Sequence, residues 1–161
     1  MDIRRKGYLF FLCVGIIASS ILSLFVTWGQ ITLPKITPDA VRSGTGAPDE
    51  MSAMFVSFLS GQTFPVTGTN GRISSLGLRI PYWTSAILVA SSSVMILMNI
   101  YKLGDFPILL PMSLYGVAAM IVVGAGTEIA MNGKLSPTFS LACFGPIAGV
   151  VLAWYIDPPK T

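Results

Sequence analysis

Residues 107–130 read PILLPMSLYGVAAMIVVGAGTEIA, and this stretch decides the fold. Glu128 is its only charged side chain. A helix needs about 20 mainly apolar residues to cross about 30 Å of hydrocarbon, whereas the buried helices of soluble domains are usually shorter. We therefore predict a membrane-spanning helix over residues 107–130, and we expect Asp105 to cap its start.

Three further stretches have the same character, at residues 8–27, 81–101 and 137–156. Aromatic side chains gather at the ends of these stretches, where their amphipathic rings are favoured at a membrane surface; they are Trp28, Tyr82, Trp83, Trp154 and Tyr155. The sequence thus predicts an all-α integral membrane protein that forms a bundle of four transmembrane helices in a single domain.

The composition favours the same class of protein. Hydrophobic residues make up 53% of the 161 residues and charged residues only 11%, whereas a soluble domain needs about a quarter charged residues to cover its surface. The net charge of +3 indicates nucleic-acid binding only weakly, because basic residues beside membrane spans have a simpler explanation in topology. We expect the lipid bilayer, and no nucleic acid, to surround the chain.

Basic residues indicate the orientation. If four spans alternate, one side of the membrane receives Arg4, Arg5, Lys6, Lys102 and Lys160. The other side receives Lys35, Arg42, Arg72, Arg79 and Lys134, but most of these belong to a long loop, where the positive-inside rule is weaker. The rule therefore places the first side in the cytoplasm. We expect a multi-pass protein of the plasma (inner) membrane with both termini cytoplasmic and the loop at residues 29–80 outside. The first span should be retained rather than cleaved, because its apolar stretch exceeds the about 7–15 residues of a signal peptide and no A-x-A site follows.

The loop at residues 29–80 is predicted to form a small cap on the outer side of the bundle. A proline and two acidic residues at positions 48–50 favour a helix start, and the residues that follow place five apolar side chains on one helical face; these are Met51, Met54, Phe55, Phe58 and Leu59. The dipeptide Asn70-Gly71 favours the type I′ turn of a β-hairpin between residues 64–67 and 72–80. We expect the apolar face either to pack on the loop and the span ends or to dock on a partner subunit or the lipid interface.

Catalytic and metal chemistry is not indicated. The sequence has no histidine, which removes the commonest haem and zinc ligand and the commonest general base. Cys13 and Cys143 fall in different spans, and we interpret both as packing residues. We expect no catalytic residue, no metal site and no enzymatic activity. A lipid, carotenoid or quinone could still occupy an apolar groove, since such ligands need no histidine.

Glu128 is the one acidic residue inside an apolar stretch, and an ionisable side chain in a span is a candidate functional group. It lies close to the polar connection that follows, so it can also reach water or pair with Lys134, Arg72 or Arg79. The alternatives are therefore a structural ion pair, a proton or cation site, and a solvated side chain.

Small residues in the spans indicate close helix packing. Gly145 and Gly149 form a G-x-x-x-G pattern, and Gly15 and Gly124 provide small patches in two other spans. Pro146 lacks an N–H group and should disturb the fourth helix. These residues are the candidate helix-packing sites.

The leading hypothesis is a non-catalytic accessory or structural subunit of a larger membrane complex, such as a respiratory or photosynthetic electron-transport complex. Other transmembrane subunits would be its partners, held by helix packing and by the outer loop. The alternatives are a small oligomeric transporter or channel that uses Glu128, and a membrane assembly factor that uses the loop helix.

Overall fold

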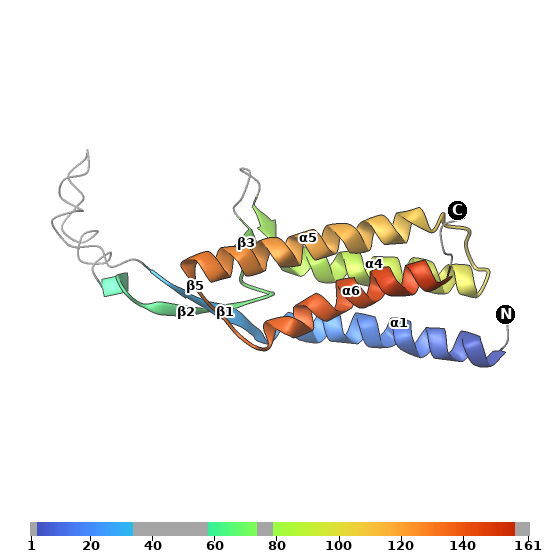
Figure 1. Cartoon of the computed structure of the whole chain (residues 1–161), viewed down its shortest axis with the longest axis horizontal. Helices are drawn as coiled ribbons and strands as arrows, with labels where there is room; N and C mark the ends of the chain where they lie inside the picture. Colours follow the sequence, from blue (N-terminus) through green and yellow to red (C-terminus); the bar gives the residue numbers. More distant parts are fainter. Residues whose placement is uncertain (1–2, 34–57, 74–78, 157–161) are drawn as a thin grey trace.

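The computed structural model describes residues 3–33, 58–73 and 79–156. Four long helices run side by side, and a small sheet lies at one end of them (Figure 1). The helices are α1 (Ile3–Ser23), α4 (Trp83–Ile100), α5 (Leu109–Asn132) and α6 (Phe139–Ile156). Each is long and apolar enough to cross a membrane, which confirms the four apolar helices predicted from the sequence.

The two ends of the bundle differ. At one end α1 begins, α6 finishes and α4 turns into α5; we call this the terminal end (Figure 1). At the other end the chain forms strands, and we call this the sheet end. Helix α1 finishes at Ser23, four residues before the predicted end of the first span, because the chain becomes extended at Thr27.

The sheet end contains two antiparallel sheets. The larger one has the strand order β2-β1-β5, formed by β1 (Thr27–Thr32), β2 (Thr63–Thr67) and β5 (Gly133–Leu135). The smaller one pairs β3 (Arg72–Ile73) with β4 (Ile80–Pro81). The chain is therefore mostly helical with a small sheet region. The four helices and the presence of strands in the loop agree with the prediction, whereas the pairing of the strands differs from it.

The predicted hairpin across Asn70-Gly71 is wrong. Strand β2 pairs with β1, and β3 pairs with β4, so the segments on the two sides of this dipeptide belong to different sheets. A type I′ turn needs a positive φ at both central residues, and neither Asn70 nor Gly71 has one. The Asn70 side chain instead bonds back to β2, and the Gly71 N–H group donates to the Thr67 carbonyl over 3.0 Å.

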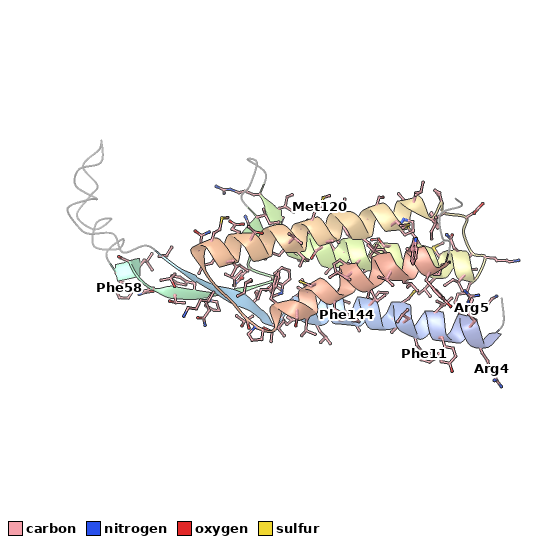
Figure 2. All side chains as sticks on the ribbon, viewed as in Figure 1. Arg4, Arg5, Phe11, Phe58, Met120 and Phe144 are labelled. Atoms are coloured by element: carbon pink, nitrogen blue, oxygen red, sulfur yellow. The ribbon has the colours of Figure 1, made fainter. Side chains whose placement is uncertain are left out.

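The core has two parts along the bundle. The part toward the terminal end surrounds the fully buried Tyr115 of α5, and the part toward the sheet end surrounds the fully buried Trp28 of β1. On the outside, Phe11, Met120 and Phe144 point away from the bundle and are more than half exposed (Figure 2). Apolar side chains thus fill the interior and also cover the helix surface, as expected where hydrocarbon surrounds the helices.

Two further predictions concern the cap of α5 and the helix in the loop. Asp105 does not cap α5: the N-cap is Ile108, which makes no side-chain capping bond, because the helix starts later than expected. Of the predicted loop helix, Phe58 and Leu59 are described and are helical. Met51, Met54 and Phe55 lie outside the described residues.

Candidate functional site

Trp28 fixes the sheet to the helices. Its indole ring is fully buried and stacks on the ring of Tyr82 just before α4, with 5.1 Å between centroids and 6° between planes. Phe139 of α6 meets the indole edge-on at 5.6 Å. The indole Nε1 donates a 2.6 Å hydrogen bond to the carbonyl of Ser23, the last residue of α1. One side chain therefore contacts three helix ends, so the sheet is held firmly on the bundle.

Two glycines let the segment after β2 approach the rings of Trp28 and Tyr82 closely. A Cβ atom on Gly71 would collide with the Tyr82 ring, and one on Gly68 would lie 3.1 Å from the Trp28 ring and 2.7 Å from Leu24. The segment between β2 and β3 therefore packs its backbone directly on the aromatic rings, and a larger residue at either glycine would push it away.

The two faces of the larger sheet differ in polarity. Ile31 packs with the sheet-end core, and a Cβ atom on Gly29, two residues earlier on the same face, would collide with Ile129 of α5. The opposite face carries polar side chains, among them Thr32 and Thr63, whose hydroxyl oxygens lie 3.2 Å apart. The apolar face therefore rests on α5 and the polar face is directed away from it.

The β1–β2 ribbon extends beyond the end of α5 (Figure 1). Apolar side chains are uncovered at its tip within the part of the chain that the structure describes. They are Leu33 at 36% exposure, Phe64 at 41% and Phe58 at 70%, and Phe58 lies at the far end of the ribbon (Figure 2). We call these three residues the tip patch. Phe58 is the described member of the predicted docking face, together with the partly buried Leu59.

The free edge of β2 is blocked against further strand pairing. Asn70 folds its side chain along this edge: its Oδ1 accepts from the Thr67 N–H at 2.7 Å, and its Nδ2 donates to the Pro65 carbonyl at 3.2 Å. Pro65 itself has no N–H group to offer. A partner at this end would therefore be recognised through side chains such as those of the tip patch rather than by addition of a strand.

Glu128 lies on α5 close to the sheet end. Its Oε2 atom is buried and has no hydrogen-bond partner in the described part of the chain. Arg72, Arg79 and Lys134 are all described, and none is found in an ion pair with it there. Tyr82 is near enough to sense its charge: burial, and to a smaller extent the Glu128 carboxylate, raises the pKa of the Tyr82 phenol to about 12.

The four candidate packing glycines have different surroundings. A Cβ atom on Gly149 would collide with the Tyr115 ring of α5, and one on Gly145 would collide with the Ser20 hydroxyl of α1. A Cβ atom on Gly124 would lie 3.3 Å from the side chain of Ile73 of β3. Gly15 has no neighbour within 4 Å of such an atom. Three of the glycines therefore serve contacts inside this chain, and Gly15 faces outward.

The interior of the bundle offers little polar chemistry. Its buried hydroxyl-bearing residues are mostly serines that donate to carbonyls of their own helix, such as Ser93, which donates to Val89 at 2.9 Å. Ser93 also shares a 2.7 Å hydrogen bond with the Tyr115 hydroxyl and so links α4 to α5. Cys13 and Cys143 are free thiols. Among the described residues, no three acidic or cysteine side chains come together as a metal site.

Comparisons with protein-family models, curated protein sequences and solved structures found no match to this chain. Sequence reasoning assigned Trp28 to the membrane surface and missed its role as the anchor of the sheet. The signal was present in residues 27–32, where β-branched and aromatic side chains favour a strand directly after the first span.

Proposed function

We propose that this chain is a multi-pass integral membrane protein that acts as a non-catalytic accessory subunit of a larger membrane complex. The observation that carries the proposal is the β1–β2 ribbon: it is anchored by Trp28, extends past α5 and exposes the tip patch. A firmly held surface with uncovered aromatic rings suits recognition of a protein partner, because it is already ordered before binding.

The helix surface supports a second contact with the same complex. In the most apolar part of α1, 28% of the residues are buried inside the chain, compared with 33–39% in the other three helices. Gly15 lies on the uncovered side of α1, where it would allow a neighbouring helix to approach closely. Helix α1 is therefore the helix that we assign to a transmembrane partner.

The proposed orientation has the terminal end in the cytoplasm and the sheet end outside, in a plasma (inner) membrane. Its support is the basic cluster of Arg4, Arg5 and Lys6 at the start of α1, together with Lys102 between α4 and α5. The tip patch would then meet an extracytoplasmic part of the partner. A respiratory or photosynthetic electron-transport complex is the type of host that we put forward.

The test is co-purification from native membranes with a tag on the chain. We expect a partner at fixed stoichiometry with the wild type and its loss with Phe64→Asp, which charges the tip patch. Thr63→Asp is the matched control, because it adds the same charge to the opposite face of β2 and should keep the partner. Isolation of the chain alone, or an unchanged yield of partner with Phe64→Asp, would contradict the proposal. Transient association below fixed stoichiometry would instead indicate an assembly factor.

A small oligomeric transporter or channel is the second candidate, and Glu128 is the observation that favours it. A buried carboxylate oxygen without a partner can take up a proton or a cation. We would then expect ion flux through the protein in reconstituted vesicles and its loss in Glu128→Gln. Absence of flux with the wild-type protein would remove this candidate.

A further inference from the structure

An open groove lies at the terminal end, opposite the sheet. Its volume is about 750 Å³, and it lies between the end of α4, the connection to α5 and the end of α6. Polar groups in its lining include the side chains of Asn99, Lys102 and Asp105, whereas Leu103, Phe106 and Ile156 give it apolar walls. The groove thus combines a charged part with an apolar part at the level where the apolar helices end.

The fold sets the shape of this groove. Asn99 holds the connection in place through two hydrogen bonds to Phe106: its Nδ2 donates to the carbonyl at 2.7 Å, and its Oδ1 accepts from the N–H group at 2.9 Å. A Cβ atom on Gly104 would lie 2.7 Å from the Phe106 ring, so glycine lets the ring pack against the turn. The groove wall is therefore built by specific contacts, and a ligand would find it already formed.

Cations from two separate segments lie at the terminal end. Lys102 lines the groove, and two residues of α1 rest on rings whose next residue along the chain lines it. The Arg5 guanidinium lies 5.4 Å from the ring centre of Tyr155, which precedes Ile156, and the Lys6 ammonium lies 6.0 Å from that of Tyr101, which precedes Lys102. Arg4 points away from the bundle (Figure 2). Asp105 is the acidic side chain in the lining. Among the described residues, this end carries Arg4, Arg5, Lys6 and Lys102 against Asp105, so the balance there is positive.

We propose that this groove binds the phosphate of an anionic phospholipid headgroup from the adjoining leaflet. Lys102 would contact the phosphate, Arg5 and Lys6 would add positive potential, and Leu103, Phe106 and Ile156 would contact the glycerol and upper acyl chains. The positive-inside rule requires only that basic residues lie near the ends of the spans, and it does not require them to share one site. Here Lys102 lines one preformed groove, and Arg5 and Lys6 of α1 lie on the rings of Tyr155 and Tyr101 at the same end of the bundle. Basic pockets between helices are known to hold anionic lipids.

The test uses the full-length protein purified in a neutral detergent and measures its thermal unfolding midpoint. The probes are short-chain phosphatidylglycerol, short-chain phosphatidylcholine and inorganic phosphate. We expect phosphatidylglycerol to raise the midpoint saturably at concentrations at which the other two have little effect. The apparent affinity should fall as salt is added, because part of the binding is electrostatic.

Four variants assign the effect to the groove. Lys102→Gly and Arg5→Ala should each weaken the affinity for phosphatidylglycerol about fivefold, the value expected for one basic residue near a charged headgroup. Arg4→Ala is the matched control and should keep the affinity, since Arg4 points away from the groove. Asp105→Asn should strengthen binding, because it removes the acidic group from the lining. A damaged fold cannot produce that gain, so this variant separates a binding effect from misfolding.

Three results would overturn the proposal. Equal stabilisation by phosphatidylcholine would show that the headgroup charge is not recognised. Stabilisation by inorganic phosphate equal to that by phosphatidylglycerol would replace the lipid site by a free-anion site. Unchanged affinity in both Lys102→Gly and Arg5→Ala would place the bound lipid elsewhere on the protein. None of these results depends on the tip patch, so this proposal and the proposed accessory function can fail separately.

Discussion

The indole ring of Trp28 lies flat on the phenol ring of Tyr82, with 6° between their planes and 5.1 Å between their centroids. Trp28 comes shortly after the first helix, and Tyr82 immediately precedes α4. This stack therefore joins the two ends of the long loop and fixes the position of the sheet on the bundle. Much of what we expect of the sheet end depends on it.

Trp28→Ala should loosen the sheet and destabilise the protein by about 3–5 kcal/mol, the usual cost of removing a large buried aromatic side chain. Titration with a denaturing detergent measures the stability, and limited proteolysis reports cleavage between residues 27 and 81. Trp28→Phe should cost less, because a ring remains on Tyr82, although the hydrogen bond to the Ser23 carbonyl and part of the indole packing are lost. Equal stability of the alanine variant and the wild type would show that the sheet does not depend on this stack.

Gly149→Ala should destabilise the bundle by about 1–3 kcal/mol, because the added methyl group collides with the buried Tyr115 ring. Gly15→Ala is the matched control: nothing lies within 4 Å of the added methyl group, so the isolated protein should lose no stability. The same detergent titration compares the two variants. If Gly15→Ala instead weakens co-purification of a partner, the effect identifies α1 as the helix that meets it.

Asn70→Ala should open the edge of β2, because the Thr67 N–H and the Pro65 carbonyl lose the side chain that bonds them. A free strand edge promotes pairing with other chains. We expect the variant to form dimers or larger species in size-exclusion chromatography, in a manner that depends on protein concentration. Thr69→Ala, in the same turn, is the control and should keep the oligomeric state of the wild type. An elution profile of Asn70→Ala identical to that of the wild type would contradict the proposed edge protection.

Lys102→Gly should stabilise the protein by about 1 kcal/mol. Lys102 has a φ of 58°, a left-handed conformation that is unfavourable for a residue with a side chain and free of that cost for glycine. The residue occupies the position after α4 at which glycine commonly ends a helix, and the Leu103 N–H closes the turn on the Met98 carbonyl at 2.9 Å. Lys102→Ala keeps the left-handed cost and should give no gain in the same stability measurement.

The sequence was sufficient to predict the four helices, because the requirement behind them is local. A stretch such as residues 107–130 is long and apolar enough to cross a membrane as a helix, and no distant residue is needed to see this. The ends were less certain: α1 finishes at Ser23 rather than at residue 27, because the strand after it pairs with segments far along the chain. The candidate glycines were found by their spacing, but spacing could not tell that Gly149 faces Tyr115 while Gly15 faces outward.

By itself, then, the sequence determined how many long helices form and which segments are apolar. Only the tertiary structure decided which strands pair, where the Asn70 side chain bonds, and that Trp28, Tyr82 and Phe139 meet in one cluster. Helix formation depends on neighbours three or four residues apart, so composition and period reveal it. The pairing of residues 27–32 with 63–67 and 133–135 joins segments that no local pattern connects, and only the packed helices bring them together.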